Sequence, residues 1–90
     1  MYSVVYTKEA KTAIDKLSLK KKRQIKVAVE RISQDPQVGK ALTHELKGLF
    51  SYRSGDYRII YNIRHSEILV IILTVGHRKD VYSKTVRKIN

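Results

Sequence analysis

Cationic and phenolic side chains gather around the most apolar run of the sequence, ILVIILTV at residues 68–75. The candidates on either side of it are Arg53, Arg58, His77, Arg78 and Tyr82. Arginine keeps its proton and can bind a phosphate through two parallel hydrogen bonds, whereas tyrosine and histidine can orient or move protons. Together these side chains could cleave RNA without a metal, by attack of a 2′-OH on its own phosphate. That reaction needs a proton acceptor, a proton donor and cations beside the developing charge.

Each candidate also has a purely structural interpretation. Arg58 could pair with Asp56 or Glu67, or lie on a solvated sheet face. His77 could be a turn residue, and Tyr82 could pack its ring on a sheet. The three histidines are scattered, cysteine is absent, and no GxxxxGK[ST] loop occurs. The sequence therefore predicts no metal site and no cofactor.

The charge balance predicts a polyanionic partner. Lys and Arg number 19 against 8 Asp and Glu, which gives a net charge of +11. Nucleic acid or an acidic protein would suit this surplus, including an acidic amphipathic segment that folds on binding. Much of the charge falls in one segment that could contact RNA or simply face solvent: Lys20, Lys21, Lys22, Arg23 and Lys26. Arg53 is a further candidate for RNA binding.

Hydropathy argues against a membrane or secreted protein. No apolar run approaches the ~18 residues of a membrane span. Lys8 and Glu9 interrupt any apolar N-terminal region, so no signal peptide is expected. The sequence predicts a cytoplasmic protein with a single domain over residues 1–90.

The first half of the chain predicts a strand followed by two helices. YSVVY at residues 2–6 is β-branched and aromatic, as strands are. Thr7 suits a cap for a helix over residues 8–17, and Ser18 a cap for a second helix over 19–34, which ends before Asp35-Pro36. The second helix has one apolar stripe, so it should lie on a core. A loop with at most a short helical turn is expected over 37–48.

The second half predicts an antiparallel meander. Apolar and polar residues alternate over 49–53 and 56–64, with a turn at Ser54-Gly55, and a third strand covers 67–75. Gly76 should end that strand, and Asp80 could cap a short last helix. The whole is an α+β fold in which two helices cover one face of a four-stranded sheet and leave the other face open.

Three motifs resemble the RelE/ParE superfamily of bacterial and archaeal toxins, and the RelE-type mRNA interferases in particular. They are LKGLFSYRSGDYRIIY at 46–61, the apolar strand with VGHRKDVY at 75–82, and the basic C-terminal tail. The resemblance implies a toxin that a cognate RelB-like antitoxin neutralises. It implies that the free toxin enters the A site of the 70S ribosome and cuts translated mRNA, which inhibits translation.

The resemblance also implies roles for individual residues. Arg58 matches the family's phosphate-stabilising arginine, Arg78 the second catalytic arginine, and Tyr82 the tyrosine that orients or activates the 2′-OH. His77 lies at a variable position beside Arg78. RelE toxins carry two lysines in the strand before DYR, and Leu49 and Ser51 stand at those positions here.

That departure leaves the general base open among Lys47, His77 and Tyr82. Two other functions fit the same sequence: a ParE-like inhibitor of DNA gyrase, and a non-catalytic basic module that binds RNA or the ribosome. The GHRKDVY ending resembles that of the RelE-type nucleases, and this resemblance favours the nuclease over the gyrase inhibitor.

Overall fold

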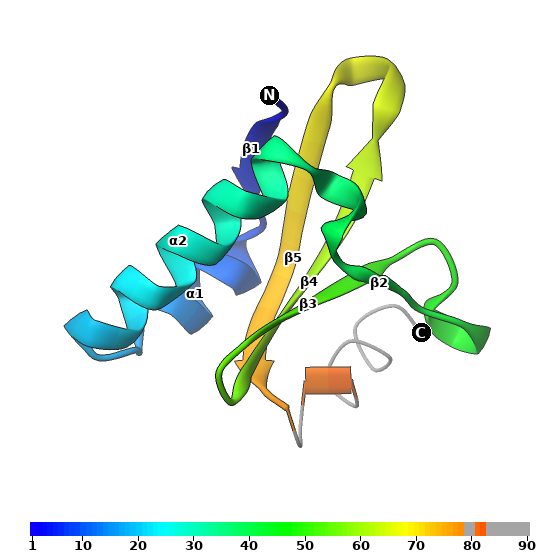
Figure 1. Cartoon of the computed structure of the whole chain (residues 1–90). Helices are drawn as coiled ribbons and strands as arrows, with labels where there is room; N and C mark the ends of the chain where they lie inside the picture. Colours follow the sequence, from blue (N-terminus) through cyan, green and yellow to red (C-terminus); the bar gives the residue numbers. More distant parts are fainter. Residues whose placement is uncertain (79–80, 83–90) are drawn as a thin grey trace.

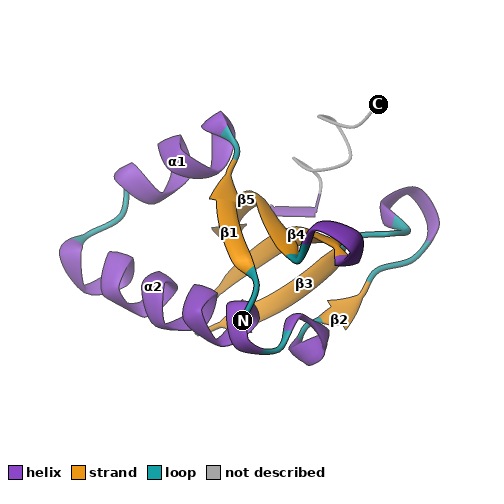
Figure 2. Ribbon diagram, turned by 90° about the horizontal axis from the view of Figure 1, so that it is seen from above, coloured by secondary structure: helices purple, strands orange, loops and turns teal. Residues whose placement is uncertain are grey.

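A computed structural model of the chain describes residues 1–78, 81 and 82. The elements run in the order β1 (Ser3–Tyr6), α1 (Lys8–Asp15), α2 (Leu19–Gln34), η1 (Pro36–Val38), β2 (Lys40–Ala41), η2 (His44–Leu46), β3 (Phe50–Ser54), β4 (Tyr57–Arg64), η3 (His65–Glu67) and β5 (Leu69–His77). Helices α1 and α2 lie together on one side of the sheet (Figure 1, Figure 2). The predicted α+β class and element order are confirmed.

Both helices begin at the predicted caps. The Thr7 hydroxyl accepts a hydrogen bond from the backbone N–H of Ala10, and the Ser18 hydroxyl accepts one from Lys21. These contacts satisfy backbone donors that the first helical turn leaves without partners. Helix α2 has the predicted bounds, whereas α1 ends two residues earlier than expected, at Asp15.

The sheet has five strands instead of four, in the order β1-β5-β4-β3-β2. The extra strand is the two-residue β2, which pairs with β3 where a loop was expected. Such a short segment has no periodicity of its own and forms only because β3 offers it a free edge. Strand β1 runs parallel to β5, and the predicted meander of β3, β4 and β5 is antiparallel.

The meander strands are displaced from the predicted bounds by one or two residues: β3 covers Phe50–Ser54 instead of 49–53, β4 begins at Tyr57 instead of 56, and β5 covers Leu69–His77 instead of 67–75. The β3–β4 turn is Gly55-Asp56, one residue later than expected, and Gly55 takes the positive φ of +62° that such a turn requires. Gly76 does not end β5, which continues to His77 with Gly76 paired to Arg58. The pairing of β4 with β5 shifts between Ile60 and Tyr61, so Leu73 is an extra residue in β5.

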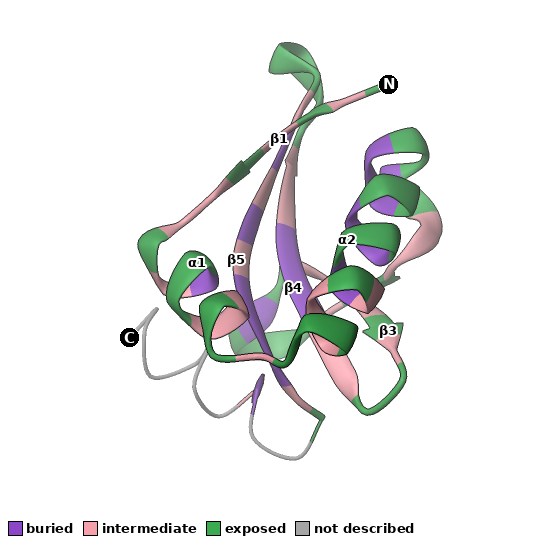
Figure 3. Cartoon of the chain, turned by 90° about the vertical axis from the view of Figure 1, so that its left-hand side faces the viewer, coloured by how far each residue is buried: buried purple, intermediate pink, exposed green. Residues whose placement is uncertain are grey.

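The sheet divides two apolar clusters. The larger lies on the face under α1 and α2, which we call the helix face, and includes Ile25, Ile32, Ile59, Tyr61 and Ile72. Its buried positions follow the inner side of α2 and run along β4 and β5 (Figure 3). This is the face predicted from the alternation in β4.

The opposite face, which we call the far face and which carries Ser51, Arg58 and Ile60, is not fully open as expected. Leu46 and Leu49 fold over one end of it, and Val81 packs there with Ile60. Val81 and Tyr82 are helical. The rest of the expected last helix, with its cap Asp80, lies outside the described residues.

None of the helices in the described part is long and apolar enough to cross a membrane.

Candidate functional site

Two arginines lie side by side on the far face. Arg53 of β3 and Arg58 of β4 are direct cross-strand partners, so their side chains leave the same face of the sheet. Arg53 Nε donates to the carbonyl oxygen of Gly55 at 3.2 Å. Like charges directly opposite each other in a sheet are destabilising, so this pair costs stability unless an anion joins it.

Arg58 has an unused hydrogen-bond donor. Its Nε is buried and bonds to no acceptor in the described part of the chain. Glu67, one of the carboxylates considered for pairing with Arg58, instead approaches Arg64 Nε at 4.0 Å. A buried guanidinium N–H without a partner is costly and suits a site that receives an anionic oxygen.

Tyr82 lies next to Arg58. The centre of the Arg58 guanidinium is 6.0 Å from the centroid of the Tyr82 ring, at the limit of a cation–π contact. The phenolic oxygen forms a hydrogen bond of 3.0 Å with the hydroxyl of Ser51 on β3. Arg58 and Tyr82, two of the candidates from the sequence, therefore meet on the far face, and Arg53 is the cross-strand partner of Arg58.

Gly76 allows Tyr82 to reach this position. A Cβ placed on Gly76 would lie 3.2 Å from both Cβ and Cγ2 of Val81, closer than ordinary contact. Val81 is fully buried against the far face. A glycine at this point of β5 leaves room for Val81 on the far face, with Tyr82 beside Arg58.

Arg78 lies at the same end of the sheet. Its backbone N–H donates to the carbonyl oxygen of Asp56 at 2.9 Å, which joins the end of β5 to the β3–β4 turn. Its side chain is exposed. Arg78 comes two residues after Gly76, the cross-strand partner of Arg58.

His77 projects from the other side of the sheet. It pairs with Tyr57, which packs on the helix-face cluster, and the two rings meet edge to face with centroids 6.0 Å apart. Lys21 of α2 adds its ammonium group 5.7 Å from the Tyr57 ring centroid. The structure therefore groups His77 with Tyr57 and Lys21, apart from Arg58 and Tyr82.

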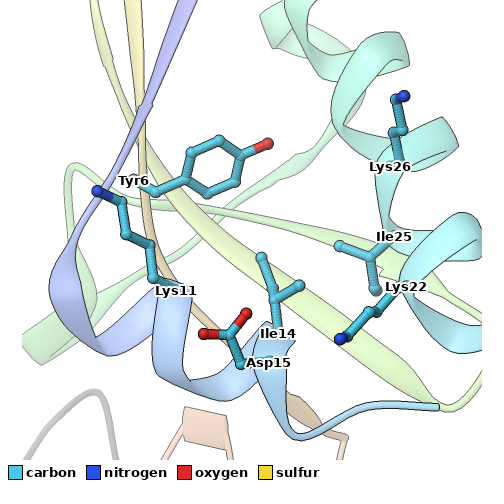
Figure 4. A pocket seen from close by; sticks show the side chains of 7 residues that line it. All are labelled: Tyr6, Lys11, Ile14, Asp15, Lys22, Ile25 and Lys26. Carbon is cyan, nitrogen blue, oxygen red and sulfur yellow. The ribbon is translucent and has the colours of Figure 1, made fainter. Parts of the chain in front are cut away.

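The basic residues of α2 do not form one uniform surface. Lys21 lies over the Tyr57 ring on the helix face, while Lys20, Arg23 and Lys26 are exposed. Lys22 and Lys26 line a hollow of about 210 Å³ between the two helices. Its other lining residues are Tyr6, Lys11, Ile14, Asp15 and Ile25 (Figure 4).

Lys47 follows η2 and is exposed, one residue after the buried Leu46. Two residues, Ser51 and Lys40, were not among the site candidates from the sequence, although Ser51 was noted at a position where RelE toxins carry a lysine. Ser51 bonds to Tyr82, and Lys40 of β2 is the cross-strand partner of Ser51, so its side chain leaves the same face. The available signal was the alternation in residues 49–53, which places residue 51 on the face of Arg53. Lys40 gave no signal, because β2 was not predicted.

Two tyrosines outside this site have raised pKa values. Burial raises the pKa of Tyr61 to about 12, with a smaller contribution from the Asp35 carboxylate, although a hydrogen bond from the Gly39 N–H opposes the shift. Burial also raises the pKa of Tyr6, beside the hollow between the helices. Within residues 1–78, 81 and 82, no three acidic or histidine side chains are grouped so that they could hold a metal ion.

Comparisons with known proteins agree in pointing to bacterial toxins. Residues 4–82 match the family model described as the ParE toxin of type II toxin–antitoxin systems, parDE. Toxin RelG of Mycobacterium tuberculosis is 38% identical over 85 residues, covering 92% of this chain and 98% of that protein. Toxin RelE of the same organism is 39% identical over 46 residues, covering 51% of this chain and 47% of the relative.

Solved structures show the same fold. The toxin–antitoxin complex RelBE2 from M. tuberculosis contains a chain that superposes with a TM-score of 0.78 at 38% identity, covering 86% of this chain and 98% of that one. The isolated E. coli RelE toxin superposes over 100% of both chains with a TM-score of 0.75, at 22% identity.

Proposed function

The chain belongs to the ParE toxin family, within the RelE/ParE superfamily of type II toxin–antitoxin systems, and from this premise we propose that it is a ribosome-dependent mRNA endonuclease. As a toxin of such a system it has an antitoxin as partner, and solved complexes of related toxins with RelB-type antitoxins support a RelB-like one. We place its action in the cytoplasm, on mRNA in the ribosomal A site.

One observation carries the proposal: Arg58, the cross-strand partner of Arg53, lies beside the phenol of Tyr82. The buried, unpartnered Nε–H of Arg58 fits a phosphate oxygen, and the phenolic oxygen can orient a neighbouring 2′-OH.

In the proposed reaction the 2′-oxygen attacks the adjacent phosphorus and the bond to the 5′-oxygen breaks. The products are a 2′,3′-cyclic phosphate and a free 5′-hydroxyl. Arg58 and Arg78 stabilise the charge that develops on the phosphorane oxygens, and Tyr82 orients or activates the 2′-OH. Protons pass from the 2′-OH to a base and from an acid to the leaving oxygen.

The identity of the base is part of the proposal. Tyr82 and Lys47 remain candidates, and Lys40 joins them because it neighbours Ser51 on the far face. His77 is a weaker candidate, since it packs against Tyr57 across the sheet from Arg58. The basic residues Lys20, Lys21, Lys22, Arg23, Lys26 and Arg53 would contact RNA, and their contribution should weaken with added salt.

The test compares wild type with Arg78→Ala by primer extension on translated mRNA after induction. We expect new 3′ ends within codons for wild type and their loss, together with relief of growth arrest, for the variant. Arg64→Ala is the matched control, because Arg64 lies at the other end of β4 with a largely exposed side chain. Unchanged cleavage in Arg78→Ala would count against the proposed mechanism.

Two other activities give different results in the same strains. The matched family model takes its description from ParE, so a gyrase inhibitor is the second candidate. It would induce the SOS response while mRNA stays intact. A non-catalytic RNA-binding module would show neither, and alanine at Arg58 or Arg78 would only weaken binding in a salt-dependent way.

A further inference from the structure

Ser51 carries a buried hydroxyl on the far face, between Ile60 of β4 and Lys40 of β2. Ser51 is 5% exposed, and its cross-strand partner on β4 is Ile60, which is fully buried. Serine favours strands less strongly than valine or isoleucine does. A buried hydroxyl also costs free energy unless it has a hydrogen-bond partner. The position would be more stable with an apolar residue unless the hydroxyl is used.

The hydroxyl of Ser51 is used by Tyr82. The two oxygens lie 3.0 Å apart and join β3 to the segment that follows β5. Burial of Val81 fixes the backbone before Tyr82, but a buried neighbour does not fix the torsions of the tyrosine side chain itself. The Ser51 hydroxyl supplies the contact that holds the phenolic oxygen in one place near Arg58.

The hydroxyl groups of Ser51 and Tyr82 can form further hydrogen bonds besides the one between them. Each hydroxyl has one donor and two acceptor sites, and their mutual bond uses one donor and one acceptor. If Ser51 donates, the phenol keeps its proton for a substrate oxygen. If Tyr82 donates, its oxygen can still accept the proton of a 2′-OH. Either way the phenolic oxygen stays available at a fixed position.

The geometry points to Ser51 as the positioning residue for Tyr82, holding the phenolic oxygen beside Arg58, where it can form a hydrogen bond with the 2′-OH of a bound RNA. This inference rests on the proposed endonuclease activity. Ser51 does not touch the reacting atoms in this role. It acts through Tyr82, so removing its hydroxyl should lower the rate of the chemical step and leave RNA or ribosome binding unchanged.

A double-mutant cycle tests the inference with purified toxin and mRNA on programmed ribosomes. Ser51→Ala should lower kcat about 5- to 10-fold with little change in KM, the effect of one neutral hydrogen bond. In the Tyr82→Phe background the same substitution should change kcat by less than about twofold, because the phenol it positions is gone. Ser51→Thr, which keeps a hydroxyl, should recover most of the lost rate.

Ser33→Ala is the matched control, since Ser33 is a similarly buried serine, 6% exposed, in α2. It should leave cleavage unchanged. An equal loss from Ser51→Ala in the wild-type and Tyr82→Phe backgrounds would mean that Ser51 only supports the fold. Full activity of Ser51→Ala would also overturn the inference.

A second measurement does not depend on cleavage. With ¹³C at the ζ carbon of tyrosine, the Tyr82 signal, assigned by its loss in Tyr82→Phe, should shift between wild type and Ser51→Ala and stay unchanged in Ser33→Ala. If wild type fails to cut translated mRNA, the proposed function fails, and this signal still shows whether Ser51 holds the phenol. An unmoved Tyr82 signal would overturn the inference in either case.

Discussion

Replacing Gly76 by alanine should displace Val81 and, with it, Tyr82. The added Cβ would lie 3.2 Å from two atoms of Val81. Carbon atoms pack at roughly 3.5–4.0 Å, so the two groups must separate by about half an ångström. The same movement would stretch the 3.0 Å bond between Ser51 and Tyr82 to about 3.5 Å, where a hydrogen bond is nearly lost.

Two effects on stability oppose each other in this variant. Overpacking a core usually costs about 1–3 kcal/mol, whereas replacing glycine stiffens the unfolded chain and returns about 0.4–1 kcal/mol. The overpacking should win, because Val81 is fully buried and has little room to move. We expect a net loss of about 1 kcal/mol, which for a domain of this size lowers Tm by about 4–8 °C.

The assay measures Tm and mRNA cleavage for Gly76→Ala, Val81→Ala and the double variant. Val81→Ala removes Cγ2, one of the two side-chain atoms that the new Cβ would meet, and keeps Cβ. Part of the clash is therefore relieved, and the two changes should be less damaging together than their sum. Cleavage should fall in Gly76→Ala and partly recover in the double variant. Wild-type Tm and cleavage in Gly76→Ala, or strictly additive losses, would refute the packing argument.

Four further predictions concern three residues elsewhere in the chain. Tyr61→Phe should lower the free energy of unfolding by about 1–3 kcal/mol in urea titrations, because the Tyr61 hydroxyl donates to Pro36 at 2.6 Å and accepts from Gly39 at 3.0 Å. Since burial raises the pKa of Tyr61 from 10.0 to about 12, wild type should lose stability between pH 10 and pH 12, where the unfolded chain ionises first; melting curves of Tyr61→Phe should show a smaller loss, because Tyr6, whose pKa burial also raises, is still present. Lys40→Ala should slow cleavage about tenfold and more than Lys47→Ala does, because only Lys40 is the cross-strand partner of Ser51; equal rates in the two variants would contradict this. Ile68→Asn should raise Tm, since Ile68 is 56% exposed and has a φ of +50°, which a β-branched residue adopts only with strain; a lower Tm would show that its side chain contributes more than the strain costs.

Elements whose signals lie within a few residues could be predicted from the sequence. Helix α2 has the predicted bounds because Ser18, the apolar stripe and Asp35-Pro36 are all local. The faces of β4 followed from alternation, which put Arg58 and Tyr61 on opposite sides. The family resemblance assigned both Arg58 and Tyr82 to one site, and in the structure the Arg58 guanidinium lies 6.0 Å from the Tyr82 ring centroid.

Features that depend on neighbours distant in sequence could not be predicted. Strand β2 forms by pairing with the edge of β3, and its two residues are too few to show the alternation that predicts a strand. The Ser51–Tyr82 bond joins residues 31 positions apart. Gly76 was expected to end β5, since glycine is a poor strand former, but its lack of a side chain is what Val81 requires. Because β5 continues through Gly76, His77 keeps the alternation and falls on the helix face.

The parallel pairing of β1 with β5 has a kinetic consequence. Ser3 pairs with Leu69, 66 positions away (69 − 3), whereas β4 and β5 are joined by a connection of four residues, 65–68. Closing the longer loop costs about 2–3 kcal/mol more conformational entropy than closing the shorter one. The meander should therefore assemble first, and β1 should dock onto β5 late. Substitutions in β1 should then speed unfolding more than they slow refolding. A chain in which β1 has not yet docked would present the edge of β5, its most apolar strand, to other chains.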